Sequence, residues 1–323
     1  MKKLQDKTIV CTVFEGHYHK GVAALVNSLY VNGFEGTIWA AYKGSLPPWA
    51  VIDRKEQDYD VMTVCENLTL NFLKFPKEVF LPYCKPNFLL DLFDKYEPQA
   101  ERVIYFDCDI VVKCVFSYFE QWSDFGIMLC EDVNSPISTT DPLRYQWVEY
   151  FKKFGITVRQ DNNQYVNGGF IGLNRCAKGF LSTWETIQNL VLEDMKAMKV
   201  NVHQSHLPEK ISGLKDRTYM FNRTDQDALN VAKDATTEDL AIADSSAMDF
   251  KSIGFVMSHA AAKDKPWEKN WLMYVVKKGQ RPSATDRIFM DYTASPISIY
   301  SSRERWIKKA HLKVASVLGR VLA

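Results

Sequence analysis

The sequence lacks the motifs that mark several large protein classes. No run of 18 apolar residues occurs, so no segment is expected to span a membrane. No Gly-x-Gly-x-x-Gly follows the first apolar run, and no Walker-type Gly-Lys-Ser/Thr loop or Gly-x-Ser-x-Gly elbow is present. These absences disfavour dinucleotide oxidoreductases, P-loop NTPases and serine hydrolases of the α/β type.

Cysteine is sparse, and its spacing carries no metal or disulfide signal. The chain has 7 cysteines and no Cys-x-x-Cys, which argues against a zinc site and against a disulfide framework. Several cysteines lie within apolar runs, where the thiol behaves as a small hydrophobic group. The N-terminal segment lacks the long apolar stretch of a signal peptide. We therefore expect a reducing, cytoplasmic location.

An excess of charge of one sign is also missing. Lys and Arg number 40 and Asp and Glu 39, so the global basic excess typical of nucleic-acid-binding proteins is absent and no nucleic-acid partner is expected. Apolar residues make up 46% of the 323 residues, enough for one large domain or two small ones.

The first sixty residues contain a strand–helix–strand pattern. Residues 8–14 and 37–42 are β-rich apolar runs, and 22–31 between them has the character of a helix. This order predicts a βαβ unit and a parallel sheet. Further strands are expected at 102–106, 110–112, 125–130, 165–173 and 253–259, and a helix at 180–199. We expect an α/β fold, a mostly parallel sheet flanked by helices, over residues 1–280, followed by a tail at 281–323.

The tail is the one strongly basic segment. Residues 301–323 contain six Lys or Arg and one acid, Glu304. One helical face would carry Trp306, Ala310, Val314, Val317 and Val321. A basic amphipathic helix of this kind either lies on an anionic membrane surface or packs on the domain as an ordinary terminal helix, and the sequence leaves both open.

Asp-x-Asp occurs three times, and its context separates the copies. Asp58 and Asp60 lie in a charged stretch and are expected at the surface. Asp107 and Asp109 close an apolar strand, at the sheet edge where ligands bind in parallel α/β folds. Two carboxylates there suit Mg²⁺ or Mn²⁺ bridging phosphate oxygens, although a pair of capping or turn aspartates would look the same.

Three other positions are candidates for the same chemistry. His259 ends an apolar run, and an imidazole could complete a carboxylate site for a borderline metal such as Mn²⁺. Lys265, and similarly Lys85, offers a positive charge for a phosphate. Asn167 precedes the pair Gly168-Gly169, which marks a bulge or a close backbone approach to a ligand. A plain turn is the alternative.

Taken in order, these pieces resemble family 8 glycosyltransferases, the retaining enzymes that include bacterial lipooligosaccharide galactosyltransferases and, more distantly, glycogenin. Four matches carry the resemblance over residues 8–271. They are the strand ending in Asp107-Cys108-Asp109, the segment Asn167-Gly168-Gly169-Phe170, the run Asp225-Gln226-Asp227-Ala228-Leu229-Asn230, and His259 followed by Lys265-Pro266-Trp267.

The resemblance implies a GT-A fold and a donor site at the carboxyl edge of its sheet. Asp107, Asp109 and His259 would hold Mn²⁺ or Mg²⁺, which bridges the diphosphate of a UDP-sugar, and Lys265 would contact that diphosphate. The remaining implied donor-binding residues are Thr12 and Glu15 for uridine, Tyr18 for stacking on uracil, Lys85 for the donor, and Asn167, Gly168 and Asp225 for the sugar.

The resemblance also implies the reaction. Gln226 would lie beside the anomeric carbon, and because an amide is a poor nucleophile, same-face attack is favoured, with Asp225 or Asp227 as a possible covalent partner. The implied activity is a hexosyltransferase that moves galactose or glucose from a UDP-sugar to a glycan acceptor, such as a lipid-linked bacterial surface polysaccharide or lipopolysaccharide. Alternatives are a non-catalytic sugar-nucleotide-binding protein and a self-glucosylating, glycogenin-like initiator.

Overall fold

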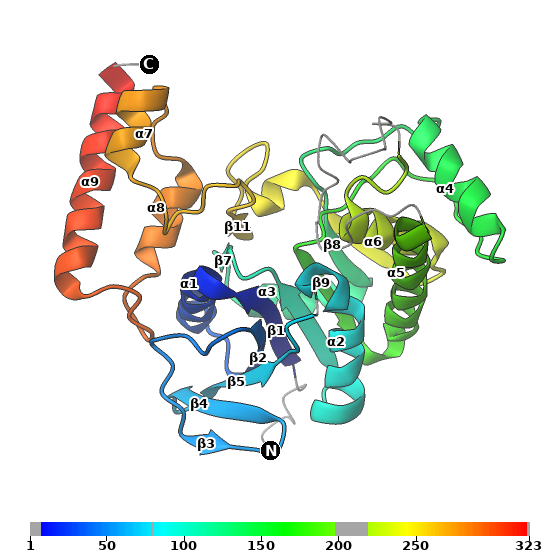
Figure 1. Ribbon diagram of the computed structural model, residues 1–323, viewed down its shortest axis with the longest axis horizontal. Helices are drawn as coiled ribbons and strands as arrows, with labels where there is room; N and C mark the ends of the chain where they lie inside the picture. Colours follow the sequence, from blue (N-terminus) through cyan, green and yellow to red (C-terminus); the bar gives the residue numbers. More distant parts are fainter. Residues whose placement is uncertain (1–7, 79, 198–218, 322–323) are drawn as a thin grey trace. The chain divides into compact units, whose positions relative to one another are not determined.

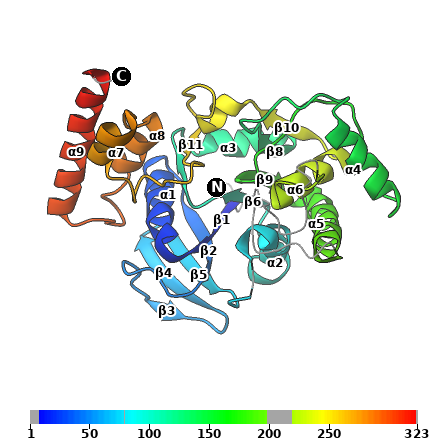
Figure 2. The same cartoon turned by 45° about the horizontal axis from the view of Figure 1, so that its top comes forward.

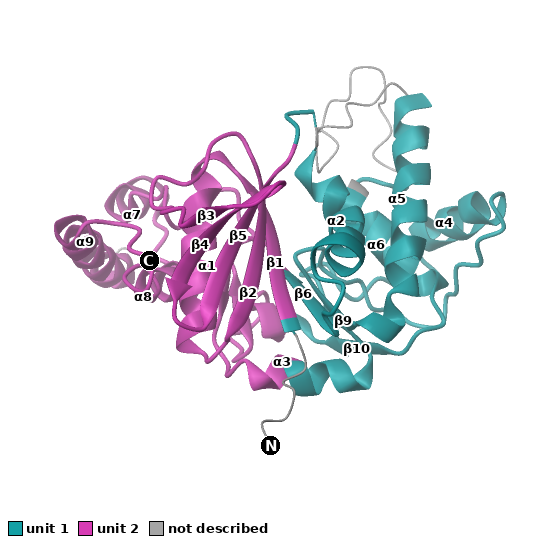
Figure 3. Cartoon of the chain, turned by 90° about the horizontal axis from the view of Figure 1, so that it is seen from below, with its two compact units in different colours: residues 1–8, 76–105, 120–245 teal, residues 9–75, 106–119, 246–323 magenta. Residues whose placement is uncertain are grey.

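The computed structural model describes residues 8–78, 80–197 and 219–321. The chain forms two compact units, each assembled from segments that are distant in the sequence (Figure 3). Unit 1 comprises residues 1–8, 76–105 and 120–245, and unit 2 comprises residues 9–75, 106–119 and 246–323. The chain therefore passes between the units several times, and each unit is described separately below.

The sheet of unit 2 begins with the βαβ pattern that the sequence predicts. Its strands are hydrogen-bonded in the order β1-β2-β5-β4-β3, with β1, β2 and β5 parallel and β4 and β3 antiparallel at the edge. Helix α1 connects β1 to β2, as expected. The bounds are β1 (Thr8–Glu15), α1 (His19–Val31), β2 (Gly36–Lys43), β3 (Arg54–Lys55), β4 (Tyr59–Cys65) and β5 (Leu68–Lys74).

Helix α1 is buried along most of its length, and a glycine in its first turn allows a close approach. Residues 21–29 are all buried. A Cβ added at Gly21 would lie 2.3 Å from the carbonyl oxygen of Cys108 and 2.8 Å from the Trp267 ring. Cys108 is the central residue of the second Asp-x-Asp motif, so α1 supports the turn that carries these carboxylates.

A small antiparallel sheet lies beside α1, which contacts β7 (Figure 1). Strand β7 (Ile110–Val112) pairs with β11 (Met257–His259), and His259 is opposite Ile110. The strand predicted at 253–259 is therefore shorter than expected. Ile253 and Phe255 are exposed in the preceding loop, where they have no sheet face to pack on.

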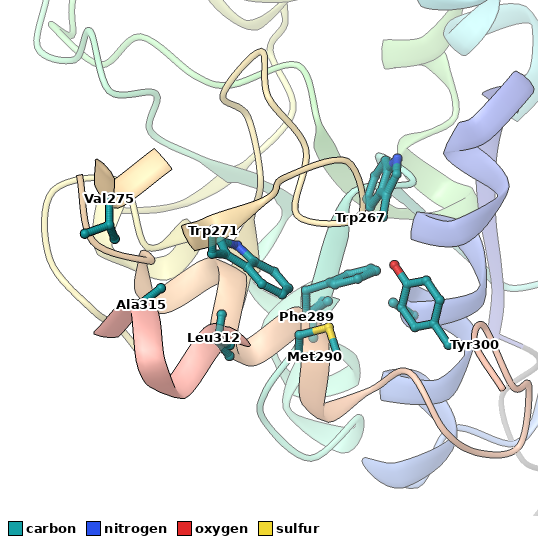
Figure 4. Close-up of a cluster of buried hydrophobic side chains, with 10 residues drawn as sticks. Trp267, Trp271, Val275, Phe289, Met290, Tyr300, Leu312 and Ala315 are labelled. Atoms are coloured by element: carbon teal, nitrogen blue, oxygen red, sulfur yellow. The ribbon is translucent and has the colours of Figure 1, made fainter. Parts of the chain in front are cut away.

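Three helices at the end of the chain complete unit 2. They are α7 (Trp271–Lys278), α8 (Ala284–Asp291) and α9 (Ser302–Val321), and α7 and α9 lie side by side (Figures 1 and 2). Their buried side chains form one apolar cluster with residues of α1 and β7 (Figure 4). Asn27 of α1 donates to the carbonyls of Tyr292 and Ile297 and accepts from the Ile297 amide, each at 2.8 Å.

Unit 1 contains the remaining strands, in the order β10-β8-β9-β6. Strands β8 and β10 are parallel, and β8 and β9 antiparallel. The bounds are α2 (Lys85–Asp91), β6 (Arg102–Phe106), α3 (Ser117–Trp122, which begins in unit 2), β8 (Ile127–Cys130), α4 (Pro142–Lys152), β9 (Phe170–Asn174), α5 (Gly179–Ala197), α6 (Thr224–Ala235) and β10 (Leu240–Ala243). Residues 198–199 of the helix predicted at 180–199 lie outside the described residues.

Most of the strand and helix predictions agree with these elements. The expected α/β class, with helices flanking a mostly parallel sheet and a helix at the C-terminal end, is confirmed. The strand predicted at 165–173 is shorter, because residues 167–169 turn and leave only an isolated bridge at Val166 before β9. The division of the chain at residue 280 stays a prediction. No helix among the described residues combines the length and apolar character needed to cross a membrane.

We expect Gly21→Ala to destabilise the protein, although alanine usually stabilises a helix relative to glycine by up to about 1 kcal/mol. The added methyl group would overlap the Cys108 carbonyl and the Trp267 ring, and overpacking of this kind costs about 1–3 kcal/mol. Chemical denaturation measures the free energy of unfolding. Gly179→Ala, in the first turn of α5 where a Cβ would meet nothing within 4 Å, is the matched control. Equal stability of the two variants would contradict the tight contact.

Candidate functional site

The second Asp-x-Asp motif forms a tight turn between β6 and β7. The Ile110 amide donates to the Asp107 carbonyl at 3.0 Å, and the Ala260 amide donates to the Asp109 carbonyl at 3.0 Å. The second bond, together with the pairing of β7 and β11, sets the register that brings His259 to the two aspartates. Residues about 150 positions apart in the sequence are thus joined by main-chain hydrogen bonds.

Asp107, Asp109 and His259 form a compact set of metal-ligating groups. His259 Nε2 lies 3.2 Å from Asp109 Oδ1 and 3.9 Å from Asp107 Oδ2, and one ligand atom from each residue lies within 4.8 Å of the others. Asp109 and His259 are buried, whereas Asp107 is partly open to solvent. Two carboxylates and an imidazole suit Mn²⁺, and the open carboxylate leaves an approach for a further ligand. The residues present therefore fit the divalent cation that the resemblance implied.

Lys265 is the counter-charge of this set. Its Nζ donates to Asp109 Oδ2 at 2.6 Å and to the Ala260 carbonyl at 2.7 Å. Burial alone would raise the pKa of Asp109, but His259 and Lys265 outweigh it and hold this pKa well below its usual value. Burial likewise opposes the charge of Lys265, yet Asp109 raises the pKa of the ammonium. Asp109 is therefore a carboxylate, and Lys265 a cation, at neutral pH.

The residues expected to contact uridine lie in β1 and in the short turn that follows it in unit 2. Thr12 lies in β1 with its hydroxyl buried and without a hydrogen-bond partner among the described residues. Glu15 is exposed and forms an ion pair with Lys43 at 2.8 Å. Tyr18 is half-buried, stacks on the His17 ring at 5.0 Å between centroids, and has Lys265 Nζ 5.6 Å from its ring centroid. Of these three, Tyr18 is the residue that the structure brings next to the Lys265–Asp109 pair.

Unit 1 gathers the other candidate residues around Lys85. Lys85 begins α2 and is buried, and its Nζ donates to the Gly168 carbonyl at 2.8 Å and lies 3.5 Å from Asp225 Oδ2. The ammonium also lies 5.2 Å from the centroid of the Tyr105 ring. Lys85 therefore joins the glycine pair to the start of α6, a contact across 140 residues that its sequence position does not reveal.

Asn167, Gly168 and Gln226 form a hydrogen-bonded amide cluster. The Gln226 Oε1 atom accepts from the Gly168 amide at 3.0 Å and from Asn167 Nδ2 at 3.3 Å. Asn167 Nδ2 also donates to Asp132 Oδ2 at 2.7 Å. A Cβ added at Gly168 would lie 3.6 Å from that of Gln226, so the chain is close to α6 here. The cluster holds the side chain of Gln226 in one orientation.

Asp227 differs from its neighbours because both of its oxygens are already engaged. Oδ1 accepts from the Tyr165 hydroxyl at 2.5 Å, and Oδ2 accepts from the Arg223 amide at 2.7 Å. Burial raises the pKa of Asp227 to about 6, although these hydrogen bonds oppose the shift. Its carboxylate therefore joins the first turn of α6 to the strand segment at Tyr165.

The structure brings the predicted residues together in two sets, one in each unit. In unit 2 the set consists of Asp107, Asp109, His259 and Lys265, with Tyr18 beside them. In unit 1 it consists of Lys85, Asn167, Gly168, Asp225 and Gln226, with Asp227 close by on α6. Sequence reasoning missed the supporting roles of Gly21 and Tyr165. A glycine within an apolar helix was the available signal for the first, whereas nothing in the local pattern marked the second.

Comparison with known proteins adds evidence on the fold. No family model matches the chain, and no curated protein matches it in sequence. An active-site mutant of LgtC is similar in structure, with a TM-score of 0.50 and 13% identity over 92% of this chain and 99% of that one. The galactosyltransferase LgtC in complex with donor and acceptor sugar analogues gives 0.49 and 13%, over the same shares of the two chains. The bifunctional glycosyltransferase WbbM gives 0.48 and 11%, over 95% of this chain and 52% of that one.

At this level of identity the likeness concerns the fold alone. The first comparison spans nearly the full length of both chains, so the two share one arrangement of strands and helices over most of their length. The GT-A fold implied by the four motifs is therefore confirmed, and the chain has the fold of a glycosyltransferase.

Proposed function

We propose that the protein is a retaining glycosyltransferase that transfers a hexose, galactose or glucose, from a UDP-sugar to a glycan acceptor with the help of a divalent metal. The observation that carries the proposal is the set Asp107, Asp109 and His259, whose ligand atoms converge within 4.8 Å. Lys265 pairs with one oxygen of Asp109, and two carboxylates with an imidazole at this spacing form a donor set that suits a divalent cation such as Mn²⁺. Their position in a GT-A fold supports a nucleotide-sugar donor.

In this proposal unit 2 binds the nucleotide part of the donor. Departure of a diphosphate creates negative charge, which a bound Mn²⁺ or Mg²⁺ would neutralise. Lys265, a cation held by Asp109, adds a fixed positive charge for the same phosphates. Tyr18 offers a ring face for uracil, and Thr12 and Glu15 offer oxygen atoms to the uridine.

Unit 1 is proposed to bind the sugar. Asn167 and Asp225 would bind hydroxyl groups, and Lys85, buried between Gly168 and Asp225, would hold that carboxylate in place. Gln226 is proposed to lie beside the anomeric carbon, and since an amide is a poor nucleophile we favour attack on the same face as the departing diphosphate. Asp227 is engaged at both oxygens, so we assign it a positioning role and leave Asp225 as the candidate covalent partner.

With Mn²⁺ present, we expect the protein to release UDP from one member of a UDP-sugar panel. EDTA should abolish the release, and Asp109→Asn should lower it by roughly a hundredfold or more, because a ligand of the proposed metal is lost and with it the positive charge that would stabilise the leaving group. Asp58→Ala, in the exposed first Asp-x-Asp motif, is the matched control and should retain full activity. Coupled detection of UDP measures the rate.

Other outcomes separate the alternatives. Calorimetric binding of UDP and Mn²⁺ without release from any donor would favour a non-catalytic binding protein. A mass increase of the protein itself after incubation with UDP-glucose would favour a self-glucosylating initiator. UDP release that persists in EDTA would contradict the metal-dependent mechanism.

We expect Asp227 to give the stability of the protein a distinct pH dependence. Its folded pKa of about 6 exceeds the ordinary aspartate pKa of 3.8, so the folded state binds the proton more tightly than the unfolded state. The contribution of Asp227 is therefore present below about pH 4 and is lost as the pH rises to about 6. Denaturation of the wild type and Asp227→Asn across this range measures it. A constant difference between the two proteins would contradict the raised pKa.

A second observation favours contact with a membrane surface. Helix α9 packs through Leu312, Ala315 and Gly319, while apolar side chains on its other faces remain exposed. Trp306 is 72% exposed and Val317 60%. The helix thus does pack on the rest of unit 2, but with the face opposite the predicted apolar stripe. We propose that this stripe, flanked by lysines and arginines, rests on anionic lipid.

Trp306→Ser combined with Val317→Ser should weaken sedimentation of the protein with anionic vesicles by roughly tenfold, because the burial of two large apolar side chains is lost. Val51→Ser, which removes an equally exposed apolar side chain from a loop of unit 2, is the control and should not change it. Equal binding by all three proteins would contradict a membrane role for the stripe.

A further inference from the structure

A cavity of about 640 Å³ lies among the three C-terminal helices of unit 2, apart from the metal-ligating residues. Its walls come from α7, the loop 279–283, the start of α8 and the last turn of α9. Trp271 and Tyr274 supply aromatic surface on one side. A cavity of this size accommodates a ligand of several polar groups, and none of the roles proposed above uses it.

The charges of the cavity are unbalanced. Lys269, Arg281 and Arg320 line it, and Asp286 is its one acidic lining residue among the described parts of the chain. Asp286 is buried and already engaged, because it pairs with Lys269 at 2.9 Å and accepts from the amide and hydroxyl of Ser283, each at 2.9 Å. Its charge is balanced by Lys269, so the two arginines are left without a carboxylate.

Helix α9 meets the loop at Gly319, the residue before Arg320, and both arginines line the cavity. A Cβ added at Gly319 would lie 2.6 Å from Arg281 Cβ and 3.1 Å from its Cα, so the residue before Arg320 touches Arg281 directly. Neither guanidinium has an ion pair or hydrogen bond within residues 8–78, 80–197 and 219–321.

We propose that this cavity binds a phosphate group, with Arg281 and Arg320 as its ligands. The planar set of N–H groups on a guanidinium matches the oxygen atoms of a phosphate. Two guanidinium groups carry two positive charges, so they suit a phosphate dianion better than a ligand with a single carboxylate. The ion pair of Lys269 and Asp286 forms the fixed wall of the site, and Gly319 lets the turn of α9 that carries Arg320 lie directly against Arg281. The phosphate belongs either to a lipid headgroup or to a soluble molecule. The proposal does not depend on the transferase activity.

The test uses the full-length protein in EDTA, so that metal-dependent donor binding does not contribute. Calorimetry measures the affinity for inorganic phosphate and, separately, for a water-soluble short-chain phosphatidic acid. Arg281→Gln combined with Arg320→Gln should weaken binding by at least about tenfold, since charge-assisted hydrogen bonds are lost. Lys277→Gln combined with Lys152→Gln removes the same charge from exposed positions of α7 and α4 outside the cavity and outside the α9 stripe, and should bind normally.

Gly319→Ala provides a second variant, because it leaves the charge unchanged. Its methyl group would overlap Arg281 and displace the loop, so binding should also weaken while circular dichroism shows intact helices. Tighter binding of the phosphatidic acid than of phosphate would identify a lipid headgroup as the source, and equal binding a soluble phosphate. Absence of binding of both probes, or equal loss in the arginine and lysine double variants, would overturn the proposal.

Discussion

The buried ion pair of Asp109 and Lys265 is the interaction on which the metal-ligating set depends. A carboxylate at the end of an apolar strand would be costly if it were unpaired, and Lys265 reaches it at 2.6 Å from a segment more than 150 residues away. His259 and Lys265 together keep Asp109 ionised, and the Asp109 oxygen that does not contact Lys265 lies 3.2 Å from His259 Nε2. Removal of either partner would leave a buried charge without its counter-charge. The same ion pair therefore stabilises the path of the chain here and holds a carboxylate that the proposed chemistry uses.

The C-terminal helices and the metal-ligating set share a hydrophobic core. Trp267, two residues after Lys265, packs in the cluster that includes Trp271, Phe289 and Tyr300. Asn27 holds the segment after α8 against α1 through three hydrogen bonds, two of them buried. Packing of α7–α9 thus supports the loop that presents Lys265. The phosphate cavity and the proposed membrane-facing stripe are therefore built on the same core as the metal ligands, within one unit.

The candidate residues of unit 1 are held by a different requirement: their buried amide groups need hydrogen-bond partners. Asn167, Gly168 and Gln226 exchange hydrogen bonds, and Lys85 closes the set by bonding to the Gly168 carbonyl. An unsatisfied buried polar group is costly, so this network favours one arrangement of the start of α6. In the proposed function, these fixed polar groups would distinguish one hydroxyl orientation of the sugar from another.

The α/β class, most strand and helix positions, and the candidates Asp107, Asp109, His259 and Lys265 could be predicted from the sequence, because periodicity and short motifs are local properties. The sequence did not determine the short β11, the α9 face that packs, or the engagement of both Asp227 oxygens. These depended on contacts between distant segments: the pairing of His259 with Ile110, the burial of Leu312 against α7, and the hydrogen bond from Tyr165. These features follow from the folded chain, because the burial and the hydrogen-bond partners of a residue depend on its neighbours in space.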